Sequence, residues 1–129
     1  MSELKTPYEL IGGATKVGEL VDRFYDLMAL EEQFADLRAM HAQDLSMARE
    51  KLTLFLIGWM GGPDLFSAKY GHPMLRAKHL PLKIGLKERN QWLACMYRAM
   101  EDCGVQGEFA TKLEQALFNT ADWMRNQPN

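Results

Sequence analysis

Apolar residues recur along most of the chain at the three- to four-residue spacing of an amphipathic helix. The first stripe begins after Thr15, a candidate N-cap, and predicts a helix over about residues 15–30. No segment shows the strict alternation of a half-buried strand. Three further stripes predict long helices over Leu45–Trp59, Trp92–Cys103 and Phe109–Met124. The pattern therefore indicates an all-α fold with four substantial helices.

Two segments between these stripes lack helical periodicity. Glu31–Gln43 has room for one or two turns of helix, and Asp64–Ile84, which is punctuated by glycine and proline, predicts one short helix at best. A structureless connection of about 20 residues is uncommon inside a compact domain and is usually functional. We therefore look for chemistry in Asp64–Ile84.

Composition narrows the class of protein. The 129 residues predict one domain, 1–129, and 47% hydrophobic residues are enough for one core. A net charge of −2 gives no basic field for nucleic acid or anionic lipid. The most apolar run, Leu52–Met60, is far shorter than the roughly 20 residues of a membrane span. Because no secretory signal is visible, Cys95 and Cys103 are expected to be reduced thiols in a cytoplasmic protein.

The segment 71–81, GHPMLRAKHLP, contains the strongest candidate for chemistry. Pro73 suits the first position of a helix and Pro81 ends it, which leaves His79 at the end of a short, rigid element. One ring nitrogen of His79 could bind a metal while the other N–H donates to a backbone carbonyl. The alternative is a half-exposed histidine favoured by the helix dipole. His72, just before Pro73, is expected to serve as an N-cap or turn residue.

Three histidines and no CxxC or HExxH motif do not make a zinc site closed by protein ligands. A metal held by one histidine is familiar where a porphyrin supplies the other four nitrogens. Three other side chains have two interpretations each. Tyr25 is either a cavity hydroxyl or a tyrosine bonded to a backbone carbonyl, Trp92 either an indole donor or core packing, and His41 either a site residue or an exposed loop residue.

Several segments resemble truncated haemoglobins of group II, in the right order from about Thr6 to Met124. They are 7–13 (PYELIGG), 21–25 (VDRFY), 61–63 (GGP), 70–81 (YGHPMLRAKHLP) and 92–96 (WLACM). The resemblance implies a truncated globin fold, a two-over-two helical sandwich around haem b (iron protoporphyrin IX). By position it implies that His79 is the proximal iron ligand, Tyr25 the distal tyrosine and Trp92 the tryptophan typical of this group.

The resemblance also assigns the surroundings of the haem. His41 stands where most members have phenylalanine or tyrosine. Ala48 stands at the gate position, where it leaves a wide opening, and Leu52, one turn later, replaces a polar residue of many relatives. The basic residues Lys51, Arg76 and Lys78 are candidates for the haem propionates, although each could equally be a solvated side chain. Tyr70 and Phe55 complete the set of expected haem contacts.

The function implied is a haem-binding globin that binds dioxygen and other small diatomic ligands and releases them slowly. Hydrogen bonds from Tyr25, Trp92 and His41 would supply up to three donors to a bound ligand with partial negative charge. Two alternatives stay open on the sequence: a haem enzyme with peroxidase-like or nitric-oxide-consuming activity, served by a reductase, and a cofactor-free helical interaction domain.

Overall fold

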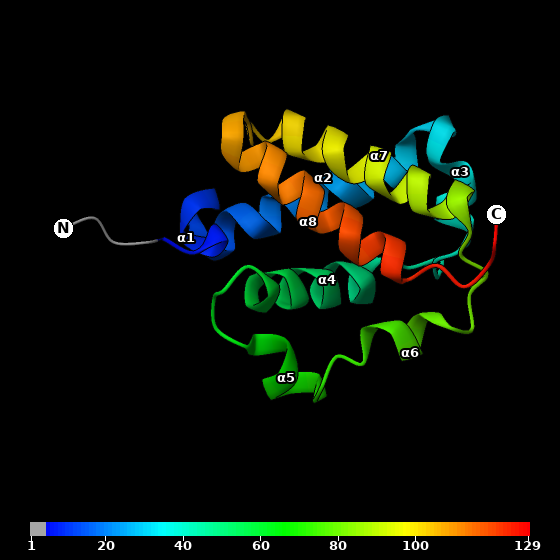
Figure 1. Cartoon of the computed structure of the whole chain (residues 1–129), viewed down its shortest axis with the longest axis horizontal. Helices are drawn as coiled ribbons and strands as arrows, with labels where there is room; N and C mark the ends of the chain where they lie inside the picture. The colour runs from blue at the N-terminus through cyan, green and yellow to red at the C-terminus, as the bar shows by residue number, and fades with distance from the viewer. Residues whose placement is uncertain (1–4) are drawn as a thin grey trace.

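The computed structural model describes residues 5–129, and every regular element within them is helical. Figure 1 shows their order along the chain. The elements are α1 (Pro7–Ile11), α2 (Gly13–Leu30), the 3-10 turn η1 (Glu32–Phe34), α3 (Ala35–Ala39), α4 (Ser46–Trp59), α5 (Leu65–Tyr70), α6 (Leu75–His79), α7 (Leu86–Asp102) and α8 (Gly107–Trp123). The predicted all-α class is confirmed, as are the four long helices α2, α4, α7 and α8.

The four long helices form a two-over-two sandwich. Helix α2 packs against both α4 and α7, and α7 packs against α8 (Figure 1). The apolar stripes read from the sequence face this interior, where Val17, Phe24 and Met96 have no exposed surface. One cluster of buried residues includes members from α1, α2, α3, α4, α7 and α8. The predicted two-over-two arrangement of helices is therefore confirmed.

The start of the chain differs from the prediction in two ways. A short helix, α1, precedes α2 because Thr6 and Glu9 form a reciprocal capping box around Pro7, which occupies the first turn. Helix α2 begins at Gly13, so Thr15 lies inside it and does not cap it. Gly12 joins the two helices with φ 115°, a conformation that favours glycine.

The segment predicted to hold at most one short helix holds two. Helix α5 begins at Leu65 and is capped by Asp64, whose side chain accepts a hydrogen bond from the Ser67 backbone N–H. Helix α6 begins only after Met74, a residue with φ 47°, so Pro73 is not its first residue as predicted. The predicted turn role of His72 is confirmed, because its Nδ1 accepts from the Met74 backbone N–H at 3.3 Å.

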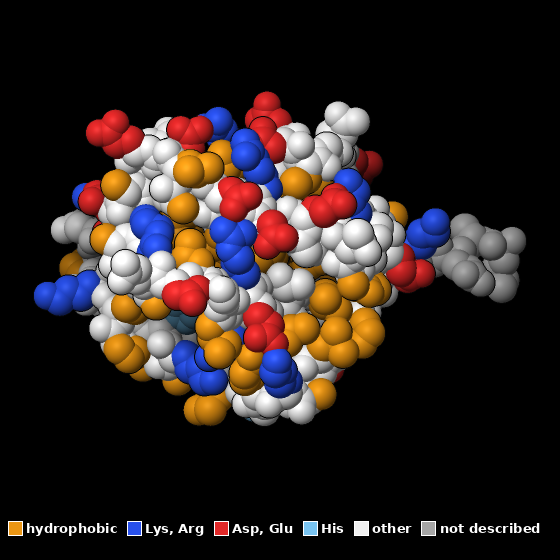
Figure 2. Space-filling model, turned by 180° about the vertical axis from the view of Figure 1, so that it is seen from behind, with side chains coloured by type: hydrophobic (Ala, Val, Ile, Leu, Met, Phe, Trp, Pro, Cys, Tyr) orange, Lys and Arg blue, Asp and Glu red, His pale blue; other side chains and the backbone are white. Residues whose placement is uncertain are grey.

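The surface charges and the cysteine side chains match what the composition predicts, namely mixed charges and reduced thiols. On the face shown in Figure 2, acidic and basic side chains are interspersed, with apolar side chains between them. Cys95 and Cys103 are both free thiols. Within residues 5–129, none of the helices is both long and apolar enough to cross a membrane.

Candidate functional site

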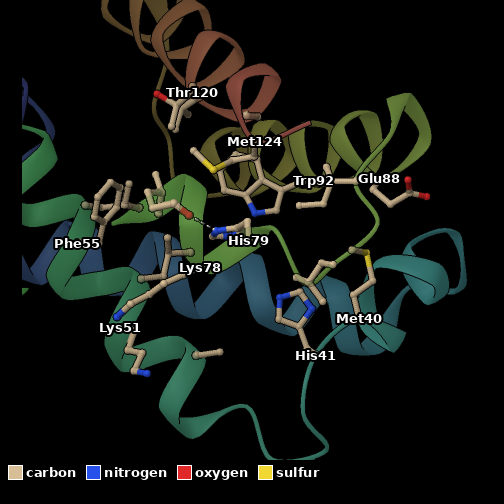
Figure 3. Close-up of a pocket in the computed structure, with 18 of the residues that line it drawn as sticks. Met40, His41, Lys51, Phe55, Lys78, His79, Glu88, Trp92, Thr120 and Met124 are labelled. Carbon is tan, nitrogen blue, oxygen red and sulfur yellow. Dashed lines mark hydrogen bonds between the residues drawn. The ribbon is translucent and has the colours of Figure 1, made fainter. Parts of the chain in front are cut away.

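An apolar cavity of about 380 Å³ lies between α4, α6, α7 and α8. This size is within the range of small-molecule sites. The long helices supply its walls, and the central segment that lacked periodicity supplies α6 on one side (Figures 1 and 3). Carbon atoms from Leu56, Trp59, Phe66, Leu117 and Ala121 form much of the lining. The few polar groups that reach this cavity decide what it can bind.

His79 enters the cavity from the last residue of α6 (Figure 3). Its Nδ1 lies 2.7 Å from the carbonyl oxygen of Leu75, one turn earlier. A carbonyl only accepts, so Nδ1 carries the proton and donates it. Nε2 of the neutral ring is then left with a free lone pair, the form that ligates metals. The hydrogen bond expected from the sequence is present.

Tyr25 and Trp92 bring two hydrogen-bond donors to the same cavity from α2 and α7. The ring of the buried Phe24 packs against both, with ring centroids 4.9 Å from Tyr25 and 5.3 Å from Trp92. Among residues 5–129 we find no hydrogen bond to the Tyr25 hydroxyl or the Trp92 indole N–H, so the carbonyl-bonded alternative for Tyr25 is not what the structure shows. Burial raises the pKa of Tyr25 to about 12, so the hydroxyl keeps its proton at neutral pH.

His41 also lines the cavity, and the centroid of its ring lies 5.8 Å from that of Tyr25. Its Nδ1 is 2.9 Å from the carbonyl oxygen of Leu37, so its one N–H in the neutral state is already used. Burial is the largest cause that lowers the pKa of His41; the hydrogen bond with Leu37 O opposes this shift, and the positive charge of Arg38 adds to it. The neutral ring therefore presents an acceptor, and the expectation that His41 would donate to a ligand needs correction.

The structure brings together three further residues predicted to surround the haem. Ala48, Leu52 and Phe55 lie on one side of α4 and line the cavity. The side chains of Ala48 and Leu52 are hydrocarbon and place no polar atom on this wall. Helix α4 therefore contributes apolar surface and no hydrogen-bond donor at these positions.

The four predicted polar contacts of the haem divide into two pairs. Lys51 and Lys78 are exposed at the cavity, where their ammonium groups lie over the rings of Tyr70 and Phe66 at 5.1 and 5.9 Å. Tyr70 and Arg76 do not line the cavity. The Tyr70 hydroxyl is directed to the sulfur of Met47, and Arg76 donates to backbone carbonyls at the end of α8.

Other cavity residues were not identified from the sequence. Met124 and Leu117 belong to the predicted apolar stripe of the last helix, whose spacing showed burial but not what the face covers. Ile84 and Leu75 come from the segment without helical periodicity, where no sequence pattern indicated that they would be part of a cavity. Their positions depend on how the central segment folds against α8.

The whole arrangement suits a large, apolar cofactor with one axial ligand and acidic groups at its edge. It offers one free imidazole nitrogen, a carbon-rich cavity and two ammonium groups at the surface. A metal held by protein alone needs several ligands, and residues 5–129 contain no cluster of three or more His, Cys, Asp or Glu side chains placed to hold one. The residues present therefore fit haem better than a bare ion.

Comparisons with known proteins identify the family. The model of the bacterial-like globin family matches residues 6–126. A group 2 truncated hemoglobin of Bacillus subtilis (strain 168) is 40% identical over 121 residues, covering 94% of this chain and 89% of the relative.

Two solved structures agree with this family. The group II 2-on-2 hemoglobin of Agrobacterium tumefaciens has a TM-score of 0.92 at 40% identity, covering 98% of each chain. The truncated oxygen-avid haemoglobin of Bacillus subtilis has a TM-score of 0.85 at 38% identity, covering 95% of this chain and 100% of the other. The chain belongs to the bacterial-like globins, and within them it is a group II truncated haemoglobin.

Proposed function

We propose that this globin binds haem b through His79 and takes up dioxygen or another small diatomic ligand, which it releases slowly. The observation that carries the proposal is the hydrogen bond from His79 Nδ1 to Leu75 O, because it leaves Nε2 of a neutral imidazole free in an apolar cavity. Bound haem would supply an iron centre with one coordination position open to a diatomic ligand.

The surroundings of His79 support a role as the residue that would hold haem iron. Donation from Nδ1 fixes the tautomer and the ring orientation, and it increases the basicity of Nε2. The carbonyl that accepts this bond belongs to the same short helix, so ring and acceptor move together. His72 is engaged with the Met74 backbone and does not line the cavity, so it is not an alternative ligand.

Lys51 and Lys78 are the residues we assign to the carboxylates of haem. Both side chains reach the cavity, and both ammonium groups lie over aromatic rings. Because such a contact uses no hydrogen-bond acceptor of the protein, the N–H groups can still donate to solvent or to a carboxylate. Arg76 is left out of this role because its guanidinium already serves the carbonyls at the end of α8.

Two donors would stabilise a ligand with partial negative charge: the Tyr25 hydroxyl and the Trp92 indole N–H. A hydrogen bond to a charged group contributes on the order of 1.5–3 kcal/mol, so two would slow ligand release by roughly a hundredfold or more. The lining of the cavity is largely apolar, and a hydrogen bond is stronger in such surroundings than in water. The relative from Bacillus subtilis, described as oxygen-avid, has the same fold.

The visible absorption spectrum of the purified protein tests this proposal. Ferric, ferrous and carbon monoxide-treated samples should give an intense Soret band with the pattern of a histidine-ligated haem. Oxygen dissociation should then be slow by stopped flow. A protein that takes up no haem when it is supplied during expression or refolding would contradict the proposal.

A further inference from the structure

Helix α6 carries His79 but has little buried surface to hold it in place. None of its five residues is buried, and it lies at the edge of the molecule (Figure 1). The residues that follow it, 80–85, have no regular structure up to the start of α7. Apolar contacts with the rest of the chain therefore hold α6 weakly, and polar contacts with distant segments help to fix its position.

The first of these contacts comes from Arg76, three residues before His79. Its guanidinium donates to the carbonyl oxygens of Trp123 and Arg125, the latter at 3.2 Å. These carbonyls lie where α8 ends, at a position where helical carbonyls lack a partner within the helix. The guanidinium also lies over the ring of Trp123, with 5.9 Å from Cζ to the centroid.

The second contact is the side-chain amide of Asn126. Its Nδ2 donates to Leu82 O at 2.7 Å and to His79 O at 3.4 Å, and its Oδ1 accepts from the Ile84 N–H at 2.9 Å. The backbone N–H of Asn126 donates to Ile84 O at 2.8 Å. Asn126 thus forms hydrogen bonds with backbone groups at both ends of the loop that follows His79. These bonds include backbone groups that the irregular loop cannot pair by itself.

The segment that bears Asn126 is itself well anchored. Met124, two residues earlier, is buried and lines the cavity. Further along, the chain passes so close to Gly85 that a Cβ there would lie 1.8 Å from Asn129 O. The end of α8 and the residues after it therefore pack against the rest of the chain and form the surface that α6 contacts.

We propose that Arg76 and Asn126 are positioning residues that hold His79 in the orientation needed to ligate haem iron. We call the two side chains and the carbonyls they bind the proximal clamp. The proposal depends on His79 being the axial ligand, as proposed above. Through the proximal clamp, the segment after α8 controls how firmly His79 holds the cofactor.

The test uses the haem-loaded protein and three variants. Asn126→Asp keeps the shape of the side chain but replaces the donor to Leu82 O and His79 O with an oxygen. Arg76→Met keeps a long stem and removes the N–H groups. Asn119→Asp is the control, because it makes the same change on an exposed part of α8, where the side chain only accepts from Gln115.

Two measurements distinguish positioning from general stability. The iron–histidine stretching band in the resonance Raman spectrum of the ferrous, ligand-free protein reports the orientation of the His79 ring. The rate of haem transfer to excess apomyoglobin reports how firmly the cofactor is held. We expect the band to shift or broaden in Asn126→Asp and Arg76→Met, and haem loss to accelerate about tenfold in each. Asn119→Asp should match the unaltered protein in both measurements.

An unchanged band in folded Asn126→Asp and Arg76→Met would overturn the proposal, even if both variants were less stable to denaturant. If Asn126→Asp does not fold, Arg76→Met decides alone: a shifted band supports the proposal and an unchanged one overturns it. If the unaltered protein lacks the iron–histidine band, the assignment of His79 fails instead, so the two failures are distinguishable.

Discussion

At the scale of single residues, a cavity side chain can donate a hydrogen bond to a ligand only if its N–H or O–H is not already bonded within the protein. His79 and His41 each donate a ring N–H to a backbone carbonyl four residues earlier, at 2.7 and 2.9 Å. Tyr25 and Trp92 reach the cavity with donors that have no hydrogen-bond partner among residues 5–129. The sequence indicated all four residues, but it could not show that His41 differs from the other two distal residues, because the partner of a ring nitrogen depends on the fold.

We predict that Trp92 contributes most to retention of dioxygen. The indole N–H only donates and cannot turn to accept elsewhere. Trp92→Phe keeps most of the packing against Phe24, so its effect reports the lost hydrogen bond. Oxygen dissociation measured by stopped flow should become faster by a factor on the order of ten, and carbon monoxide dissociation should change less. An oxygen off-rate equal to that of the unaltered protein would leave Trp92 as a packing residue only.

We predict that His41 titrates below its ordinary pKa of 6.5, because burial penalises the charged ring. Between the lowered pKa and 6.5 the unfolded state binds more protons than the folded state. The stabilisation from neutral His41 is therefore present above 6.5 and is lost as the pH falls through the lowered pKa. An NMR titration of the histidine ring protons in the carbonmonoxy form, with His41→Gln for assignment, measures this value. A midpoint at or above 6.5 would be inconsistent with the buried, neutral ring.

At the scale of elements, periodicity identified the helices that bury a face and missed those that do not. Helices α2, α4, α7 and α8 bury apolar stripes, so their existence could be read from spacing. Helices α1, α5 and α6 are five or six residues long and depend on caps and turns. Their sequence signals are local, such as Thr6 and Glu9 around Pro7, and are easily overlooked beside a long stripe.

Loss of haem should release α6 more than any long helix. Without the cofactor, α6 keeps its own short hydrogen bonds and the contacts of Arg76, Lys78 and His79 O with other segments, whereas α7 and α8 remain in the core. Hydrogen–deuterium exchange of the loaded and haem-free protein should show the largest increase in residues 71–85. Equal increases in α6 and α7 would mean that the cofactor stabilises the whole fold and not this segment in particular.

At the scale of the whole molecule, two pairs of long helices enclose a cavity, and one short, peripheral helix brings a histidine to it. The resemblance of segments such as 70–81 to group II truncated haemoglobins was enough to predict this architecture. It did not show that Arg76 is bound to carbonyls 47 and 49 residues away, so positive charge alone suggested a propionate contact. Contacts between distant segments are set by the packed fold and leave no local pattern.

The central claim is that His79 provides the axial nitrogen, and one experiment tests it most directly. His79→Gly should lose stable haem binding, and added imidazole should restore a histidine-like spectrum by occupying the space of the lost ring. His72→Ala is the matched control and should keep its haem content, because His72 bonds to the Met74 backbone and does not line the cavity. The measurement is the Soret and visible spectrum of both variants with and without imidazole. A His79→Gly protein that retains the unaltered histidine-ligated spectrum without imidazole would contradict the account.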